Sequence, residues 1–128
     1  MKLAHWGCCL LSLISTNTFA MGYSSDYISC MNTTQASTAM AARCMKAELK
    51  QQTKRYEYFA EIHVKALSKD KRKAQEKINE KWLTLRDEHC LIKNVQLSVG
   101  HASKYYSCAL KKTQAQADLL EKQAYKYR

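Results

Sequence analysis

The sequence predicts an all-α protein: a small antiparallel bundle of about four helices, one short and three long, clamped by two disulfides. The first observation is composition, because the 128-residue chain has no proline and only three glycines. A β-sandwich or barrel of this size needs many turns, which favour those two residues. The second is that apolar side chains recur every three or four residues, the period of an amphipathic helix. The third is the pattern of cysteines described below.

The first twenty residues have the features of a cleaved signal peptide. Lys2 gives a positive start, residues 8–14 form an apolar run, and Thr18 and Ala20 are small residues before a cut. The run is too short to span a bilayer permanently, which takes about 20 residues. A buried N-terminal helix is the alternative. We therefore expect cleavage near Ala20, a periplasmic or secreted location, and one helical domain over residues 21–128 without a transmembrane segment.

Cap-forming residues place the first two helices. A short helix is expected to begin after residues 24–26, where Ser, Ser and Asp stand in a row, and to break in the polar stretch 33–37. The second helix is expected over residues 39–67. Its apolar face comprises Met45, Leu49, Tyr56, Phe59, His63 and Ala66.

The third helix is expected to begin after Ser68, a fair N-cap, with Asp70 in its first turn, where the helix dipole favours negative charge. It is expected to end before Gly100, and the fourth helix to begin near Ser103. The third apolar face comprises Ala74, Ile78, Trp82, Leu85, His89, Ile92 and Val99. The fourth comprises Tyr105, Ala109, Thr113, Ala117, Leu120, Ala124 and Tyr127.

Four cysteines remain after the leader is set aside, and an even number in a short exported chain predicts two disulfides. They are Cys30, Cys44, Cys90 and Cys108. Three pairings are open. The last two lie nearly symmetrically about Gly100 and the first two about Ser37, so each pair would face across a helical turn. We predict disulfides Cys30–Cys44 and Cys90–Cys108. A zinc site is the alternative, although no C-x-x-C pair is present.

Motifs for catalysis are missing from the sequence. The three histidines of the mature part, His63, His89 and His101, are not spaced as metal ligands on one helix face. There is no G-x-S-x-G, no glycine-rich phosphate loop and no C-x-x-C redox pair. We therefore expect a protein that binds rather than catalyses, with no metal and no cofactor.

Positive charge dominates the mature part, where loss of Lys2 leaves 20 Lys plus Arg against 11 Asp plus Glu, a net charge near +9. Residues 65–77 hold six basic side chains: Lys65, Lys69, Lys71, Arg72, Lys73 and Lys77. They form either a solvated helix–helix junction or a patch for an anionic partner. In an exported protein that partner would be an anionic envelope polymer rather than nucleic acid. All eight tyrosines also fall in the mature part, and they suit either recognition or core packing.

The motif W-x-x-x-R-D-x-x-C, formed by Trp82, Arg86, Asp87 and Cys90, resembles the signature of the LprI-like lysozyme-inhibitor N-terminal domain family. That family comprises small exported bacterial helical domains, many of unknown function. Further residues match in order over about residues 27–121. They are Cys30, Thr34, Gln35, Cys44, Gly100, Ser103, Cys108, Thr113 and Leu120. The chain departs from the family in having thirteen residues between its first two cysteines, where the family usually has about two fewer.

On a helix, Trp82 and Arg86 share one face, so we expect the guanidinium to lie over the indole. Asp87 is expected to reach a neighbouring helix, and Cys90 to pin the helix end.

The resemblance implies inhibition of a lysozyme or another peptidoglycan hydrolase. A net charge near +9 would slow approach to a basic lysozyme, so a neutral or acidic hydrolase fits better. Two alternatives stay open. One is a periplasmic immunity or accessory protein for another partner. The other is a cationic module that binds anionic polymers through residues 65–77 and 122–128. The sequence does not determine the oligomeric state.

Overall fold

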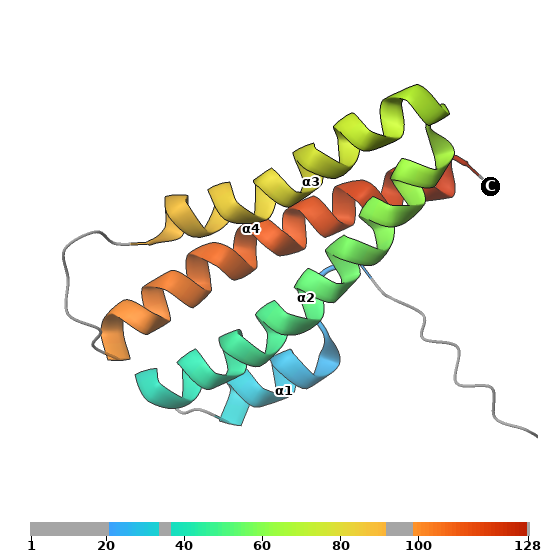
Figure 1. Ribbon diagram of the computed structural model, residues 1–128. Helices are drawn as coiled ribbons and strands as arrows, with labels where there is room; N and C mark the ends of the chain where they lie inside the picture. Colours follow the sequence, from blue (N-terminus) through green and yellow to red (C-terminus); the bar gives the residue numbers. More distant parts are fainter. Residues whose placement is uncertain (1–20, 34–36, 92–98, 128) are drawn as a thin grey trace, which may run out of the picture.

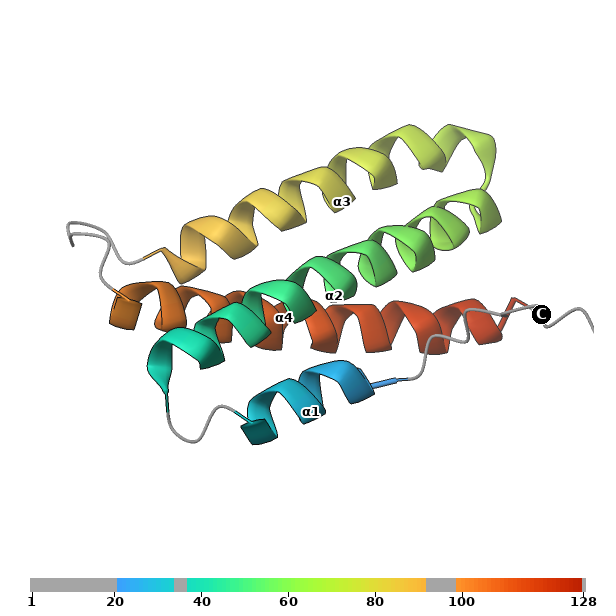
Figure 2. The same ribbon diagram turned by 90° about the horizontal axis from the view of Figure 1, so that it is seen from below.

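The computed structural model describes residues 21–33, 37–91 and 99–127, and the predicted signal peptide lies outside them. These residues form four α-helices and no strand, which confirms the predicted all-α class. The helices are α1 (Ser25–Thr33), α2 (Thr38–Ala66), α3 (Lys69–Cys90) and α4 (Val99–Tyr125). Figures 1 and 2 show α3 antiparallel to both α2 and α4, with the short α1 beside the first half of α2. Consequently α2 and α4 run parallel to each other.

The first three helices begin close to their predicted positions, and hydroxyl side chains cap the first two. Ser24 Oγ accepts a hydrogen bond from the Tyr27 amide at 3.1 Å, and Ser37 Oγ accepts one from the Met40 amide at 3.4 Å. Ser68 precedes α3, as predicted. Its hydroxyl donates to Asp70, and this hydrogen bond lowers the pKa of that carboxyl group.

The predicted boundary between the third and fourth helices was wrong. Helix α3 ends at Cys90, where Leu91 takes extended backbone angles, φ −69° and ψ 127°. Helix α4 already begins at Val99, so Gly100 belongs to its first turn and does not mark the break. The apolar residues beyond Cys90 continue the helical period in the sequence, and periodicity alone cannot detect where the backbone leaves the helix.

Helices α2 and α4 form the core of the molecule, since their contact is by far the most extensive between any two helices. Tyr56 and Phe59 of α2 pack on Ala117 and Leu120 of α4 in one cluster. A second cluster joins Met45 and Leu49 of α2 to Cys90, Ala109 and Leu110. Small side chains on α4 let the two helices approach closely.

Helix α3 lies on this pair much more loosely than its apolar periodicity predicted. Only Arg86 and Cys90 of α3 are buried. Ile78 is 58% exposed and Leu85 is 49% exposed, although both belong to the predicted apolar face. That face therefore looks largely to solvent. No helix in the described segments is long and apolar enough to cross a bilayer.

Both predicted disulfides are confirmed. The Cα atoms are 5.8 Å apart for Cys30–Cys44 and 5.6 Å apart for Cys90–Cys108, the usual separation for a disulfide. The first ties α1, which has no buried residue, to α2. The second ties the end of α3 to α4. Each thus fastens an element that buries little apolar surface of its own, and the disulfides indicate an oxidising environment.

Removing the second disulfide should destabilise the fold strongly. The double change Cys90→Ser and Cys108→Ser frees a loop with a sequence separation of 18. The chain-entropy model gives a loss of about 3 kcal/mol. For a domain of this size that corresponds to a fall in Tm of about 12–24 °C, measurable by circular dichroism. The pair Cys30→Ser and Cys44→Ser, with a separation of 14, should cost slightly less. A melting temperature unchanged by the first pair would show that α3 is held by other contacts.

Candidate binding site

A buried ion-pair network, which sequence reasoning missed, joins α2 to α4. The guanidinium of Arg55, 2% exposed, donates to Asp118 at 2.5 Å and to Glu121, which is 1% exposed. Its Nη1 donates to Gln52 Oε1 at 3.0 Å. Burying charges is costly unless all their hydrogen-bonding groups are satisfied. That condition is met here, because no buried side-chain nitrogen or oxygen among the described residues lacks a partner.

The same network continues to the first described residues of the chain. Gln52 donates to Glu48 at 2.8 Å, and Glu48 accepts from the amide and hydroxyl of Ser24 at 2.9 and 2.6 Å. The amide of Gly22 donates to Asp118 at 3.1 Å, and Gln52 donates to the Gly22 carbonyl at 3.0 Å. Gly22 adopts φ +87°, which suits glycine. Polar contacts therefore hold residues 22–24 against α2 and α4.

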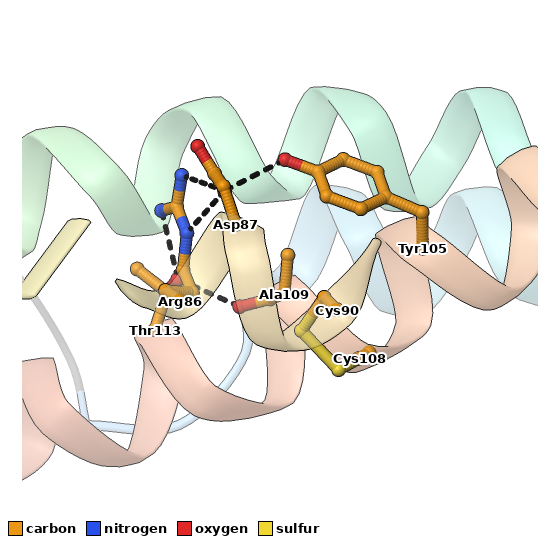
Figure 3. The surroundings of a disulfide bond; sticks show 7 residues. All are labelled: Arg86, Asp87, Cys90, Tyr105, Cys108, Ala109 and Thr113. Atoms are coloured by element: carbon orange, nitrogen blue, oxygen red, sulfur yellow. Dashed lines mark hydrogen bonds and ion pairs between the residues drawn. A yellow bond between two sulfur atoms is a disulfide. The ribbon is translucent and has the colours of Figure 1, made fainter. Parts of the chain in front are cut away.

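The signature residues form a second polar cluster beside the Cys90–Cys108 disulfide (Figure 3). Arg86 donates to Thr53 of α2 at 3.2 Å and to Thr113 of α4 at 3.1 Å. It also donates to Asp87 at 2.9 Å. Asp87 accepts a hydrogen bond from Tyr105 of α4 at 2.8 Å, which fits its predicted reach to a neighbouring helix. Arg86 therefore connects all three long helices.

Trp82 stacks on a tyrosine and not on the guanidinium that the sequence predicted. Its ring stacks on Tyr56 at 4.7 Å between centroids, while the Arg86 guanidinium is engaged by Asp87 and two threonines. The Tyr56 hydroxyl donates to the backbone oxygen of Asn79 at 3.0 Å. These contacts hold α3 against α2. These contacts give the signature residues a structural role, the attachment of α3 to α2 and α4.

The predicted basic patch lies at the tip of the α2–α3 hairpin, and its six side chains are all exposed. Arg72 donates to the carbonyls of Lys65 and Leu67 at 3.1 Å and so caps the end of α2. The last residues of α4 lie at the same end of the molecule (Figures 1 and 2), where Tyr127 contacts His63 at 3.2 Å. We call this surface the cationic end, formed by Lys65, Lys69, Lys71, Arg72, Lys73 and Lys126.

Grooves flank α3 on both sides. The groove between α2 and α3 has a volume of about 260 Å³. Its lining residues are Tyr56, Glu57, Ala60, Glu61, Val64, Glu76, Asn79, Glu80 and Leu83. The groove between α3 and α4 is larger, about 880 Å³, and its lining includes Trp82, Leu85, Lys112, Leu119 and Lys122. In the described segments, no three His, Cys, Asp or Glu side chains converge as metal ligands would.

Breaking the buried ion pair should be costly. The change Arg55→Ala leaves Glu121 buried and Asp118 partly buried without their cation. Removal of one partner of a buried pair typically costs about 3–5 kcal/mol, which urea unfolding can measure. Lys54→Ala, an exposed neighbour on the same helix, is the matched control and should change the free energy of unfolding by less than about 0.5 kcal/mol. Equal effects of the two changes would contradict this role of Arg55.

The tyrosine–carboxylate contact predicts a loss of stability in alkali. Burial, and then the hydrogen bond to Asp87, raise the pKa of Tyr105 from 10.0 to about 12. The unfolded chain therefore releases this proton first, so the stabilisation is complete below pH 10 and is lost as the pH rises towards 12. Absorbance of tyrosinate should show a late-titrating class that includes Tyr105, and Tyr105→Phe should remove one member of it. Titration of all tyrosines near pH 10 in the folded protein would contradict the prediction.

No known protein family, curated protein or solved structure significantly matches the chain. The resemblance to the LprI-like lysozyme-inhibitor family therefore depends on the sequence motif around Trp82, Arg86, Asp87 and Cys90 and the matches that accompany it. The candidate binding surfaces are the cationic end and the two grooves beside the lightly packed α3.

Proposed function

We propose that the protein is an exported binding protein that inhibits a lysozyme or another peptidoglycan hydrolase by placing its cationic end in the substrate cleft. The observation that supports this proposal is the meeting of two basic segments, residues 65–77 and the end of α4, at one end of the bundle. The class of target is inferred from the sequence motif. The mode of contact, between basic side chains and carboxylates, is inferred from the exposed surface.

Glycoside hydrolases commonly carry two catalytic carboxyl groups on either side of the bond that they cleave. Ammonium groups form strong charge-assisted hydrogen bonds with such carboxylates. The α2–α3 turn consists of only Leu67 and Ser68, so the lysines that follow it lie at the tip of a tight helical hairpin. Lys69, Lys71 and Lys73 are exposed there.

A restrained turn favours inhibition by occlusion. Arg72 donates to the carbonyls of Lys65 and Leu67 and so restricts the backbone of the α2–α3 turn before binding, which reduces the conformational entropy lost on association. The net charge near +9 predicts that the target is neutral or acidic, since a basic lysozyme would be repelled during approach.

The same cationic end favours a second candidate, a module that binds anionic envelope polymers. The two candidates differ in their response to salt. Attraction to a polymer is largely screened at a few hundred millimolar salt, where the Debye length is several ångströms. A packed contact inside a hydrolase cleft should largely survive that concentration.

A cell-wall lysis assay with acidic, neutral and basic lysozymes tests the proposal. We expect the oxidised protein to protect against a neutral or acidic enzyme at near-stoichiometric ratios in moderate salt. The triple variant Lys69→Gln, Lys71→Gln and Lys73→Gln should lose at least tenfold in inhibitory potency. Arg72 is left unchanged because it caps α2.

The matched control removes three exposed lysines of α2 that lie outside the cationic end, with Lys46→Gln, Lys50→Gln and Lys54→Gln. It lowers the net charge equally and should retain inhibition. If both triple variants inhibit like the unchanged protein, the cationic end is not the contact surface. Absence of protection against every enzyme would reject the inhibitor function, and polymer binding that disappears in salt would then favour the second candidate.

A further inference from the structure

The groove between α2 and α3 combines an apolar floor with an acidic rim. Tyr56, Ala60 and Val64 of the floor are buried, and Leu83 is half-buried. The rim consists of four exposed glutamates, Glu57 and Glu61 from α2 and Glu76 and Glu80 from α3. The chain has 11 acidic residues against 21 basic ones, so four acidic residues around one groove depart from its general character.

These glutamates lie in pairs on their helices. Glu57 and Glu61 are four residues apart, as are Glu76 and Glu80, so each pair places two negative charges on one helix face. In the described part of the chain, the ion pair at this rim joins Glu61 to the exposed Lys65, and none reaches the other three glutamates. Three of the four rim carboxylates therefore have no ion pair within the described residues and are available to a cation from a partner.

The dimensions of the groove suit a protein side chain. The bond from the Tyr56 hydroxyl to the Asn79 backbone crosses between the helices at one end, and the α2–α3 turn joins them beyond the other. The volume of about 260 Å³ lies below the range of about 300–1,000 Å³ that is usual for small-molecule sites. A single long side chain of a partner fits this space better than a cofactor.

Arginine matches both parts of the groove. Its aliphatic stem can cover apolar surface while its planar guanidinium remains in contact with polar groups. The guanidinium also presents five donors in a fork that pairs with carboxylates, whereas an ammonium group acts as a point charge. The described carboxylates do not converge as metal ligands would. The rim therefore suits a cation with delocalised charge, such as a guanidinium, better than a metal ion.

We propose that this groove is a docking site for a partner protein that inserts an arginine from an apolar segment. The stem lies on Tyr56, Ala60 and Leu83, and the guanidinium lies between the glutamates of α2 and those of α3. This site takes a cation, whereas the cationic end takes an anionic surface. The inference is therefore independent of hydrolase inhibition.

Three peptides test the inference by NMR on the oxidised, ¹⁵N-labelled protein. They are Ac-Ala-Leu-Arg-Leu-Ala-NH₂, the same peptide with citrulline for arginine, and the same peptide with lysine. Citrulline keeps the shape of arginine and removes its charge. We expect the arginine peptide to shift amide signals mainly within residues 56–64 and 76–83. Its affinity should exceed that of the citrulline peptide by at least tenfold, with the lysine peptide intermediate.

The quadruple variant Glu57→Gln, Glu61→Gln, Glu76→Gln and Glu80→Gln should lose binding of the arginine peptide by at least tenfold. The variant should stay folded, because all four glutamates are exposed and the ion pair that it removes, Glu61 to Lys65, lies at the surface. Glu88→Gln with Asp26→Asn removes exposed acidic groups outside the groove and should bind normally. If the quadruple variant fails to fold, the double variant Glu76→Gln and Glu80→Gln on the lightly packed α3 replaces it. Equal binding of the arginine and citrulline peptides, signal shifts elsewhere, or undiminished binding by the glutamine variant would overturn the proposal.

Discussion

The buried contact of Arg55 with Asp118 and Glu121 fixes how the two core helices meet. The face that α4 presents to α2 is rich in alanine, including Ala109 and Ala117, both fully buried. Such a smooth surface offers few knobs and holes to define a register. Moving one helix along the other by one turn would keep much of the apolar contact. It would, however, leave a buried guanidinium and two carboxylates without their partners. The ion pair therefore contributes specificity of alignment, while the apolar clusters contribute most of the favourable burial.

Helix α3 depends on that alignment. Its buried Arg86 bonds one threonine from α2 and one from α4, so the two core helices must already be in register for both bonds to form. The disulfide to Cys108 and the stacking of Trp82 on Tyr56 complete its attachment. Because these contacts are few and localised, α3 stands away from its neighbours elsewhere. Both flanking grooves, and with them the candidate docking surfaces, result from this light attachment.

Much of this architecture could be predicted from the sequence, because helical period, cap residues and cysteine symmetry are local signals. The cysteine pairing was predicted correctly even though the supposed symmetry was only approximate. Cys90 is the last residue of α3, whereas Cys108 lies more than two turns inside α4. The end of α3 was missed because apolar periodicity continues beyond it.

The polar interior could not be predicted, since the burial of Arg55 is decided by residues 63 and 66 positions away. In retrospect, Glu48, Gln52 and Arg55 step by four and three along α2, and Gln114, Asp118 and Glu121 do so along α4. Two polar faces with the helical period were therefore visible, but their mutual contact was not. The acidic groove was hidden for the same reason, because each helix contributes only half of its rim.

The placement of the disulfides has a consequence for motion. Both crosslinks lie in the half of the bundle opposite the α2–α3 turn, near the beginnings of α2 and α4 and the end of α3. Beyond them, the hairpin is maintained by side-chain packing and capping bonds alone. Local opening should therefore become easier along the long axis of the molecule, from the crosslinked half towards the tip. The crosslinked half should therefore be the more rigid one. The surfaces that we expect to meet partners, which are the cationic end and the groove between α2 and α3, lie in the more flexible half.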